Sequence, residues 1–245
     1  MKELSEYVYQ RKSVRRYSET KLTEEELEKV KGYISQLKPL IPEIKTSFEI
    51  VPCKDTNCGF NAEYCLLAYG EPSNLWLTNI GYMLEQLDLY LVSLDIGACW
   101  FGMGKVEEKV KDGLEFAIMM SFGKYDGETR KSADDFSRDD ADDFWSGMSD
   151  AKLGEIVRLA PSAVNSQPWR VEQIDNKLAV YRQKGKIPIL SANLYKHFNK
   201  IDMGIFLCYL DIALENEGYA FTRVLGTESD EGKRVLVATY EINKQ

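Results

Sequence analysis

The sequence predicts an α+β fold, in which a mixed sheet packs around buried central helices and two pseudo-repeats share one chain. Each half of the 245 residues contains a capped helix, a loop with proline, and then a strand. Each half continues with a long apolar helix that has a glycine in its first turn, followed by another strand. Such self-similarity is the signature of a repeated structural unit. The hydrophobic content of 44% is enough for a large core.

In the first half, Thr23 and Glu26 have the spacing of a capping box, which predicts the start of a helix. A strand is expected over 48–51. The segment 79–94 has apolar residues three and four positions apart on more than one face, which predicts a buried helix. A second strand is expected over 116–122.

The second half repeats this order, with a helix opening at 148–153 and a strand over 169–174. A long apolar helix is expected from 201 to 214 and a last strand over 235–240. Because a helix precedes a strand in each half, we expect the strands to pair across the two repeats.

The acidic segment 132–147 is predicted to be a solvated linker. It holds six aspartates within ten residues, and so many like charges disfavour a packed element. A calcium loop is the alternative, but the segment lacks the spaced glycine and distal glutamate of an EF-hand. The predicted boundaries are therefore 1–131 for the first repeat and 148–245 for the second.

Composition excludes several classes of function. The net charge of −8 argues against general binding of nucleic acid, which needs a basic face. No apolar run approaches the roughly 18–20 residues that span a bilayer. Five cysteines and no recognisable secretory signal indicate a reducing cytoplasm and no disulfide framework. One histidine excludes a histidine-cluster metal site, and no metal is expected, although a carboxylate or thiolate site stays open without supporting ligand spacing.

Two clusters have side chains suited to a phosphorylated, planar ligand. In an extended segment 11–17, Arg11, Ser13 and Arg15 face the same way, and arginine binds phosphate in bidentate fashion. In 160–169, two prolines stop the preceding helix, and Ser162, Asn165 and Gln167 offer donors and acceptors for a heterocycle edge. The alternatives are a basic surface strip and an ordinary helix-to-strand loop.

Two further clusters are rich in glycine. The segment 95–104 has three glycines, which let the backbone approach a flat ligand closely. The segment 123–131 places Arg130 and Lys131 ahead of the acidic linker. A simple turn and a solvated loop are the respective alternatives.

Together these clusters resemble the nitroreductase family. The R-x-S-x-R motif followed by an aromatic residue lies at 11–17, and A-P-S-x-x-N-x-Q-P-W is complete at 160–169. The Gly-x-x-x-x-Gly element lies at 97–102, and the Arg-Lys ending closes 123–131. The resemblance covers nearly the whole chain, and the motif at 160–169 is its most specific part.

The chain departs from the family pattern in the order of these motifs. A typical member has the two main motifs within a few dozen residues and is a homodimer with the flavin between subunits. Here they lie about 150 residues apart. The segments 36–40 and 144–147 stand where the missing copies would lie. The resemblance therefore implies a fused tandem form with one flavin site, for which a monomer suffices and a dimer is not forbidden.

The resemblance implies an FMN-dependent oxidoreductase, in which NADH or NADPH reduces the flavin and a nitroaromatic, quinone or similar small molecule is then reduced. Transfer would be ping-pong through flavin N5, without a catalytic residue of the protein. Arg11, Ser13, Arg130 and Lys131 would bind the phosphate, and Arg15 the flavin N1–O2 edge. The implied flavin-binding residues are Arg11, Lys12, Ser13, Arg15, Trp100, Phe101, Gly102, Met103, Arg130, Lys131, Pro161, Ser162, Ala163, Asn165 and Gln167.

Two other functions stay open. A protein of the same fold could bind or sense flavin without catalysis, and bound FMN without nicotinamide-driven turnover would distinguish it. A scaffold for a partner protein would bind no flavin, and would require the four clusters to coincide by chance.

Overall fold

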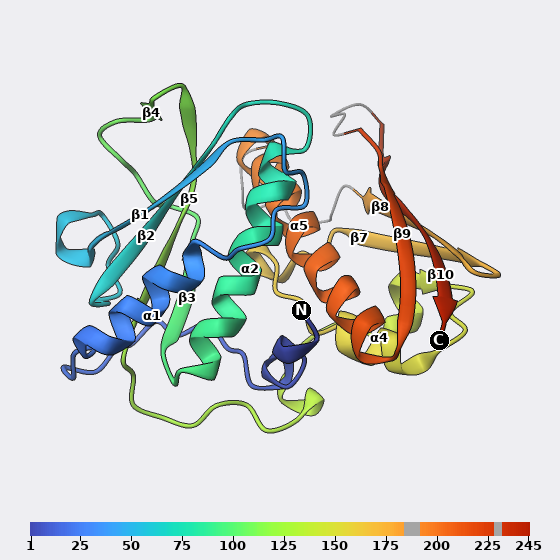
Figure 1. Ribbon diagram of the computed structural model, residues 1–245, viewed down its shortest axis with the longest axis horizontal. Helices are drawn as coiled ribbons and strands as arrows, with labels where there is room; N and C mark the ends of the chain where they lie inside the picture. Colours follow the sequence, from blue (N-terminus) through green and yellow to red (C-terminus); the bar gives the residue numbers. More distant parts are fainter. Residues whose placement is uncertain (184–191, 228–231) are drawn as a thin grey trace.

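The computed structural model describes residues 1–183, 192–227 and 232–245, and it has an α+β architecture. Two β sheets lie on either side of a central pair of helices, α2 and α5 (Figure 1). The α-helices are α1 (Glu24–Ile34), α2 (Trp76–Ser93), α3 (Ala141–Phe144), α4 (Ala151–Val157) and α5 (Ala192–Asn216). Short 3-10 helices are η1 (Lys2–Leu4), η2 (Tyr7–Tyr9), η3 (Cys53–Asp55), η4 (Ala133–Asp135) and η5 (Ala163–Asn165).

The first sheet is antiparallel and has the strand order β1-β2-β5-β3, with β4 paired to β5. In the second sheet the order is β6-β7-β8-β10-β9, and only the short β6 runs parallel to its neighbour. The strands of the first sheet are β1 (Thr46–Pro52), β2 (Tyr64–Gly70), β3 (Gly97–Phe101), β4 (Val110–Lys111) and β5 (Leu114–Gly123). Those of the second are β6 (Trp145–Ser146), β7 (Trp169–Ile174), β8 (Lys177–Gln183), β9 (Tyr219–Leu225) and β10 (Arg234–Lys244).

The prediction that strands pair across the two halves is wrong. The named strands of each half pair only with one another, and the short β6 of the acidic segment joins β7 of the second half. The physical reason is the apolar character of α2 and α5 on more than one face, since such helices need cover on several sides. They lie between the sheets and so keep the sheets apart (Figure 1).

The predicted helices and strands are otherwise present. The hydroxyl of Thr23 accepts the N–H of Glu26, and the Glu26 carboxylate accepts the N–H of Thr23, which confirms the capping box of α1. The second long helix begins at Ala192, before the predicted residue 201. Its first turns mix polar residues with apolar ones such as Phe198, so the sequence pattern there is weaker.

The acidic segment 132–147 is more structured than the predicted linker. Its six aspartates are exposed, as the charge pattern predicts. Phe136, Phe144 and Trp145, however, are buried in the main core. Trp145 also pairs with Val171 of β7. The aromatic side chains therefore fix the segment onto the second sheet while the carboxylates stay in water.

The central helices touch backbone to backbone, because a glycine of each meets a carbonyl of the other. A Cβ atom at Gly81 would lie 2.1 Å from the Ile201 oxygen, and one at Gly204 would lie 1.9 Å from the Thr78 oxygen. Each carbonyl belongs to the residue three positions before the partner glycine. The contact is thus nearly the same from either helix, and only glycine permits it.

Among the described residues, no helix combines the length and apolar composition that crossing a bilayer requires.

We expect Gly204→Ala to lower the stability of the protein by about 3 kcal/mol, because the new methyl group must push the two backbones apart. For a chain of this size the melting temperature would fall by roughly 6–12 °C. Gly32→Ala is the matched control, since Gly32 lies within α1 and a Cβ there meets nothing within 4 Å. That variant should be unchanged or more stable by up to about 1 kcal/mol. Equal melting temperatures for the two variants would contradict the close helix contact.

Candidate functional site

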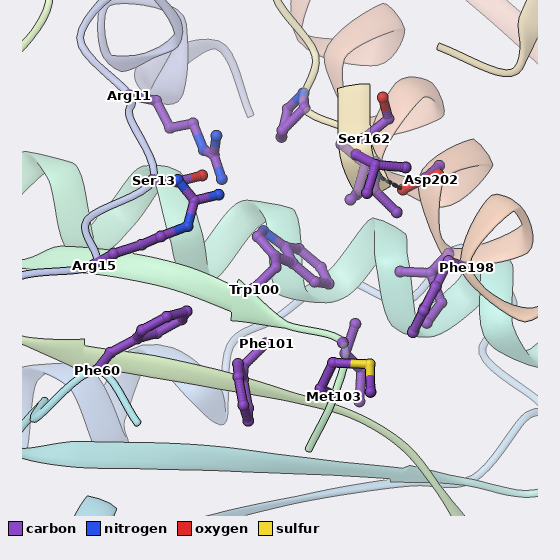
Figure 2. A pocket seen from close by; sticks show the side chains of 17 residues that line it. Arg11, Ser13, Arg15, Phe60, Trp100, Phe101, Met103, Ser162, Phe198 and Asp202 are labelled. Carbon is purple, nitrogen blue, oxygen red and sulfur yellow. Dashed lines mark hydrogen bonds between the residues drawn. The ribbon is translucent and has the colours of Figure 1, made fainter. Parts of the chain in front are cut away.

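Two adjoining cavities lie where segments of both halves meet. One has a volume of about 310 Å³ and mostly apolar walls, and the other has about 460 Å³ and basic walls. They share six lining residues: Arg11, Ser13, Arg15, Pro161, Ser162 and Val164. Figure 2 shows Arg11, Ser13, Arg15 and Trp100 on one side of the apolar cavity, and Ser162, Asp202 and Phe198 on the other.

The N-terminal segment lies beside β3 as an extended strand. Ser13 forms a parallel bridge with Ala98, and the N–H of Val14 donates to the Ala98 carbonyl at 2.8 Å. Side chains alternate along such a segment, so Arg11, Ser13 and Arg15 all face the cavities. The spacing R-x-S-x-R thus places two guanidinium groups and one hydroxyl on one wall.

Arg11 is buried and ion-paired, unlike the surface cation that a phosphate site usually offers. Its Nε and Nη2 lie 2.9 and 2.8 Å from the same carboxylate oxygen of Asp88 on α2. The indole Nε1 of Trp100 donates to that oxygen as well, at 2.9 Å. Asp88 therefore neutralises Arg11 and orients Trp100, which makes Arg11 a positioning residue for the wall of the cavity.

The positive charge of the basic cavity comes from other residues. Lys12, Arg15, Arg130 and Arg138 all line it. Burial, together with the charges of Arg11 and Arg130, lowers the pKa of Arg138 to about 10. Burial and the charge of Arg11 likewise lower the pKa of Arg130. These shifts mean that cations crowd together there, and an anion such as a phosphate would relieve the repulsion.

Arg138 was not predicted as a site residue, because it lies in the acidic segment that was expected to be a solvated linker. Its Nε donates to the Ala160 carbonyl at 3.0 Å, and its Nη1 donates to the Asn165 side-chain oxygen at 2.6 Å. A lone arginine within a run of aspartates is the signal that could have found it. The residue links the acidic segment to the loop 160–169.

The loop 160–169 is held in a strained shape. Val164, Asn165 and Gln167 have φ angles of 48°, 58° and 44°, the left-handed region that side chains with a Cβ avoid. Asp202 of α5 accepts the N–H of Ala163 at 2.9 Å, and the Ser162 hydroxyl accepts the N–H of Gln167 at 2.9 Å. Strain of this kind persists where surrounding contacts fix the backbone, and it is frequent at ligand sites.

All predicted site residues except Lys131 and Gln167 line one or both cavities. The exposed Lys131 pairs with Glu128, and the buried Gln167 accepts the N–H of Asp139 through its side-chain oxygen. Gln167 therefore fastens the acidic segment to the loop. Asn165 reaches the basic cavity only, where its side chain is occupied by Arg138 and by the Ser137 carbonyl.

Several lining residues carried no sequence signal for a site. An apolar residue in a helix or strand reads as core whether it faces a cavity or not. These residues are Phe60, Ile118, Phe198, Ile201, Asp202 and Ile205. Asp202 differs from the rest, because burial raises its pKa to about 8, against the lowering effect of its bonds with Ala163 and Ser166.

The two sheets, the buried helix pair and the paired cavities define an α+β protein with a site for a small ligand that is apolar at one end and anionic at the other. Residues 3–214 match the family model described as "Putative TM nitroreductase". The chain belongs to this nitroreductase family, and membership supports a general oxidoreductase role with small-molecule substrates.

A solved structure with similar topology agrees on the fold. The crystal structure of a putative nitroreductase from Thermotoga maritima MSB8 superposes with a TM-score of 0.67 at 19% identity, over 97% of this chain and 92% of that one. An FMN-dependent nitroreductase from Clostridium difficile R20291 superposes with a TM-score of 0.44 at 16% identity, over 54% of this chain and 93% of its own. No curated protein sequence matches the chain.

Asp202 makes the stability of the ligand-free protein depend on pH. Its pKa is about 8 in the folded chain and about 4 in an unfolded one, so the folded chain holds a proton that the unfolded chain releases. This contribution to stability is complete below about pH 4 and is lost as the pH rises through about 8.

We therefore expect the melting temperature of the wild type to fall, between about pH 5 and pH 9, by at least about 2 °C more than that of Asp202→Asn. Asparagine keeps the acceptor for Ala163 without the carboxylate. Asp134→Asn, at an exposed aspartate of the acidic segment, should follow the wild type. Parallel curves for Asp202→Asn and the wild type would show that Asp202 does not hold the proton.

Proposed function

We propose that this protein is an FMN-dependent NAD(P)H oxidoreductase that reduces a nitroaromatic, a quinone or a similar small acceptor. The observation that carries the proposal is the direct connection of an apolar cavity to a basic one. FMN has the same division into a flat ring system and a phosphate. Family membership adds the reaction class.

The residues present fit the cofactor. Lys12, Arg130 and Arg138 line only the basic cavity and would hold the phosphate, since none of them has a compensating anion among the residues that line it. The ring system would lie between the apolar side chains that face each other across the first cavity, which include Trp100, Phe101, Met103, Phe198 and Ile205.

Two backbone features favour close approach to a flat ring. A Cβ at Gly102 would lie 2.7 Å from the Phe198 ring, so glycine lets this turn pack against α5 without displacing that ring. The strained loop brings Pro161, Ser162 and Ala163 to the opposite side of the cavity.

When bound, FMN would supply the redox chemistry, by accepting a hydride equivalent from the nicotinamide and passing it to the acceptor. The protein would contribute position and electrostatics. Arg15 lines both cavities and is exposed, and it makes no ion pair with the described residues. Its fixed charge would stabilise the negative charge that reduction places on the ring. The aromatic walls would exclude water from the reacting edge.

We further propose that 1–131 and 148–245 are two diverged copies of one unit, joined by 132–147 and retaining one flavin site. The nearly symmetric glycine contact of α2 and α5 supports this. So does a buried aspartate seven residues after each glycine, Asp88 after Gly81 and Asp211 after Gly204. A monomer would then contain a complete site.

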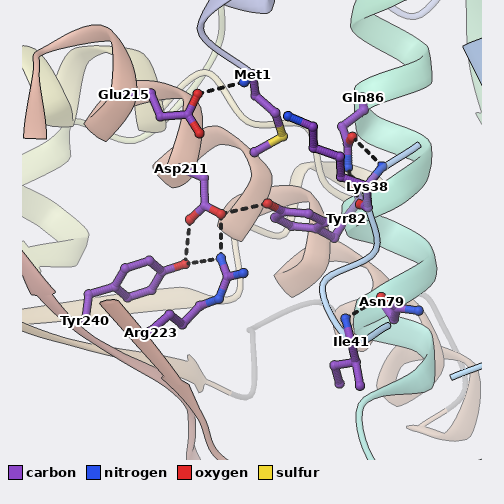
Figure 3. Close-up of polar contacts among 10 residues, drawn as sticks. All are labelled: Met1, Lys38, Ile41, Asn79, Tyr82, Gln86, Asp211, Glu215, Arg223 and Tyr240. Carbon is purple, nitrogen blue, oxygen red and sulfur yellow. Dashed lines mark hydrogen bonds and ion pairs between the residues drawn. The ribbon is translucent and has the colours of Figure 1, made fainter. Parts of the chain in front are cut away.

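The surroundings of the second aspartate support a single site. Asp211 accepts the Tyr82 hydroxyl at 2.7 Å and the Tyr240 hydroxyl at 2.9 Å, and it pairs with Arg223 (Figure 3). Nearby, the side chains of Gln86 and Asn79 bind the backbone at Lys38 and Ile41 (Figure 3). If the two halves are copies of one unit, these side chains and this backbone would occupy the positions that a second ligand would need.

The first experiment is an absorbance spectrum of the purified protein, with anaerobic addition of NADH and then NADPH. We expect flavin bands for one FMN per chain, bleached by at least one of the two nucleotides. Two FMN per chain would refute the single-site proposal. Bound FMN that neither nucleotide bleaches would favour a binding or sensing protein, and failure to take up FMN would refute the function.

A variant tests the phosphate end. We expect Arg138→Gln to raise the Kd for FMN at least tenfold, about 1.4 kcal/mol, while the Kd for riboflavin, which has no phosphate, changes much less. Lys131→Gln is the control, since Lys131 lies outside both cavities, and its Kd values should stay within about twofold. An equal loss for both ligands in Arg138→Gln would mean that the residue only supports the loop.

A further inference from the structure

Three thiols meet at one end of the first sheet, outside the proposed flavin site. The sulfur atoms of Cys53, Cys58 and Cys65 all lie within 4.8 Å of one another. Cys65 lies on β2 opposite Val51, and the N–H of Cys53 donates to the Glu63 carbonyl at 3.0 Å. Strand pairing therefore fixes two of the sulfurs. The sequence spacing of four and six intervening residues gave no sign of this convergence.

The third sulfur is positioned by a tight turn. The hydroxyl of Thr56 donates to the Cys53 carbonyl at 2.7 Å and accepts the N–H of Cys58 at 3.1 Å. The N–H of Thr56 donates to the same Cys53 carbonyl at 3.0 Å. These bonds return the chain toward the sheet, so Cys58 is held over the other two cysteines before any ligand is present.

The dimensions suit a metal ion bound by sulfur. Zinc–sulfur bonds are about 2.3 Å, so tetrahedral geometry places the sulfurs roughly 3.8 Å apart. Thiols already within 4.8 Å need to move by no more than about 1 Å. Cys53 and Cys65 are buried among Leu67, Tyr69 and Met119, whereas Cys58 is half-buried. The cluster is thus closed on the sheet side and open to water beside Cys58.

A cation could reach the three cysteines from solvent, and the electrostatics of the cluster would favour its binding. A depression of about 670 Å³ reaches Thr56 and Asn57, and its walls include Glu107 and Glu108. Three adjacent thiolates would repel one another unless a cation lay between them, so the cluster gains from holding a positive ion.

We propose that Cys53, Cys58 and Cys65 bind one thiophilic d¹⁰ cation of the Zn²⁺ class, with water as the fourth ligand. Binding of Zn²⁺ replaces three thiol protons, which go to solvent, and leaves a complex of net charge −1. No electron is transferred. Soft thiolate ligands select such ions over Mg²⁺ or Ca²⁺.

By holding Cys53 and Cys58 together, the ion would rigidify the turn between them. That turn contacts the segment 101–105 at the edge of the proposed flavin cavity. The Asn57 side chain donates to the Met103 carbonyl at 2.9 Å and accepts the N–H of Lys105 at 2.7 Å. Two residues after Cys58, the ring of Phe60 meets Phe101 edge to face at 5.2 Å. A metal at the cysteines would therefore fix the segment 101–105 from outside, without touching the cavity.

The test uses the full chain, stripped with a chelator and kept reduced with a phosphine. Titration with Co²⁺ should give thiolate charge-transfer absorption that saturates at one ion per chain, and Zn²⁺ should displace it with release of protons. Zn²⁺ at a hundredfold excess over its Kd should raise the melting temperature by about 5–10 °C. Amide exchange should slow over 53–60 and 101–105.

Of the three cysteines, Cys58 is the one whose replacement should disturb folding least, because it is only half-buried. The variant Cys58→Ser should lose at least about a hundredfold in Zn²⁺ affinity. Cys208→Ala is the control, since Cys208 is a buried cysteine of α5 outside the cluster, and it should bind like the wild type. Absence of cobalt charge-transfer bands in the reduced wild type would overturn the proposal. So would unchanged affinity in Cys58→Ser. These readouts are independent of FMN.

Discussion

The contact of α2 with α5 through Gly81 and Gly204 determines where everything else lies. Because each glycine admits the backbone of the other helix, the axes approach more closely than side chains would permit. Asp88 then reaches Arg11 from one helix, and Asp202 reaches the loop 160–169 from the other. The two walls of the cavity are therefore aligned by a contact that lies inside the molecule and touches no ligand.

The site divides its charges between two tasks. Asp88 neutralises Arg11 and orients Trp100, so the Arg11 guanidinium helps to hold the cavity wall in place. Arg130 and Arg138 face the same region without a buried carboxylate of their own, and burial lowers the pKa of both. A buried ion pair and an uncompensated pair of cations thus adjoin each other. The first gives a fixed geometry, and the second gives an affinity for anions.

Much of the fold could be predicted from the sequence, because periodicity and capping are local. The capping box at Thr23 and the apolar helices are examples. Strand pairing was predicted wrongly, since no local pattern says which faces two buried helices will cover. The motif residues gathered at the cavities, because R-x-S-x-R and A-P-S-x-x-N each need only a short segment of defined backbone.

Other parts of the site depend on tertiary contacts that no short segment encodes. From the sequence alone, Arg138 belongs to a solvated acidic segment. In the folded chain Phe136 and Trp145 are buried in the core, and this brings Arg138 to the loop 160–169. From the sequence alone, Asp202 is one polar position of an apolar helix. Its role depends on the loop 160–169, whose Ala163 N–H donates to it in the folded chain. The convergence of three cysteines required a turn whose geometry rests on one threonine hydroxyl.

The cavity walls also set the order in which the protein acquires its site. Arg11 and Asp202 lie far apart in the sequence, so the site cannot assemble before synthesis has reached α5. Contacts of such sequence separation form late and slow the search for the native state. A ligand held there stabilises only molecules in which both walls have folded, so its occupancy reports that the two halves are correctly assembled.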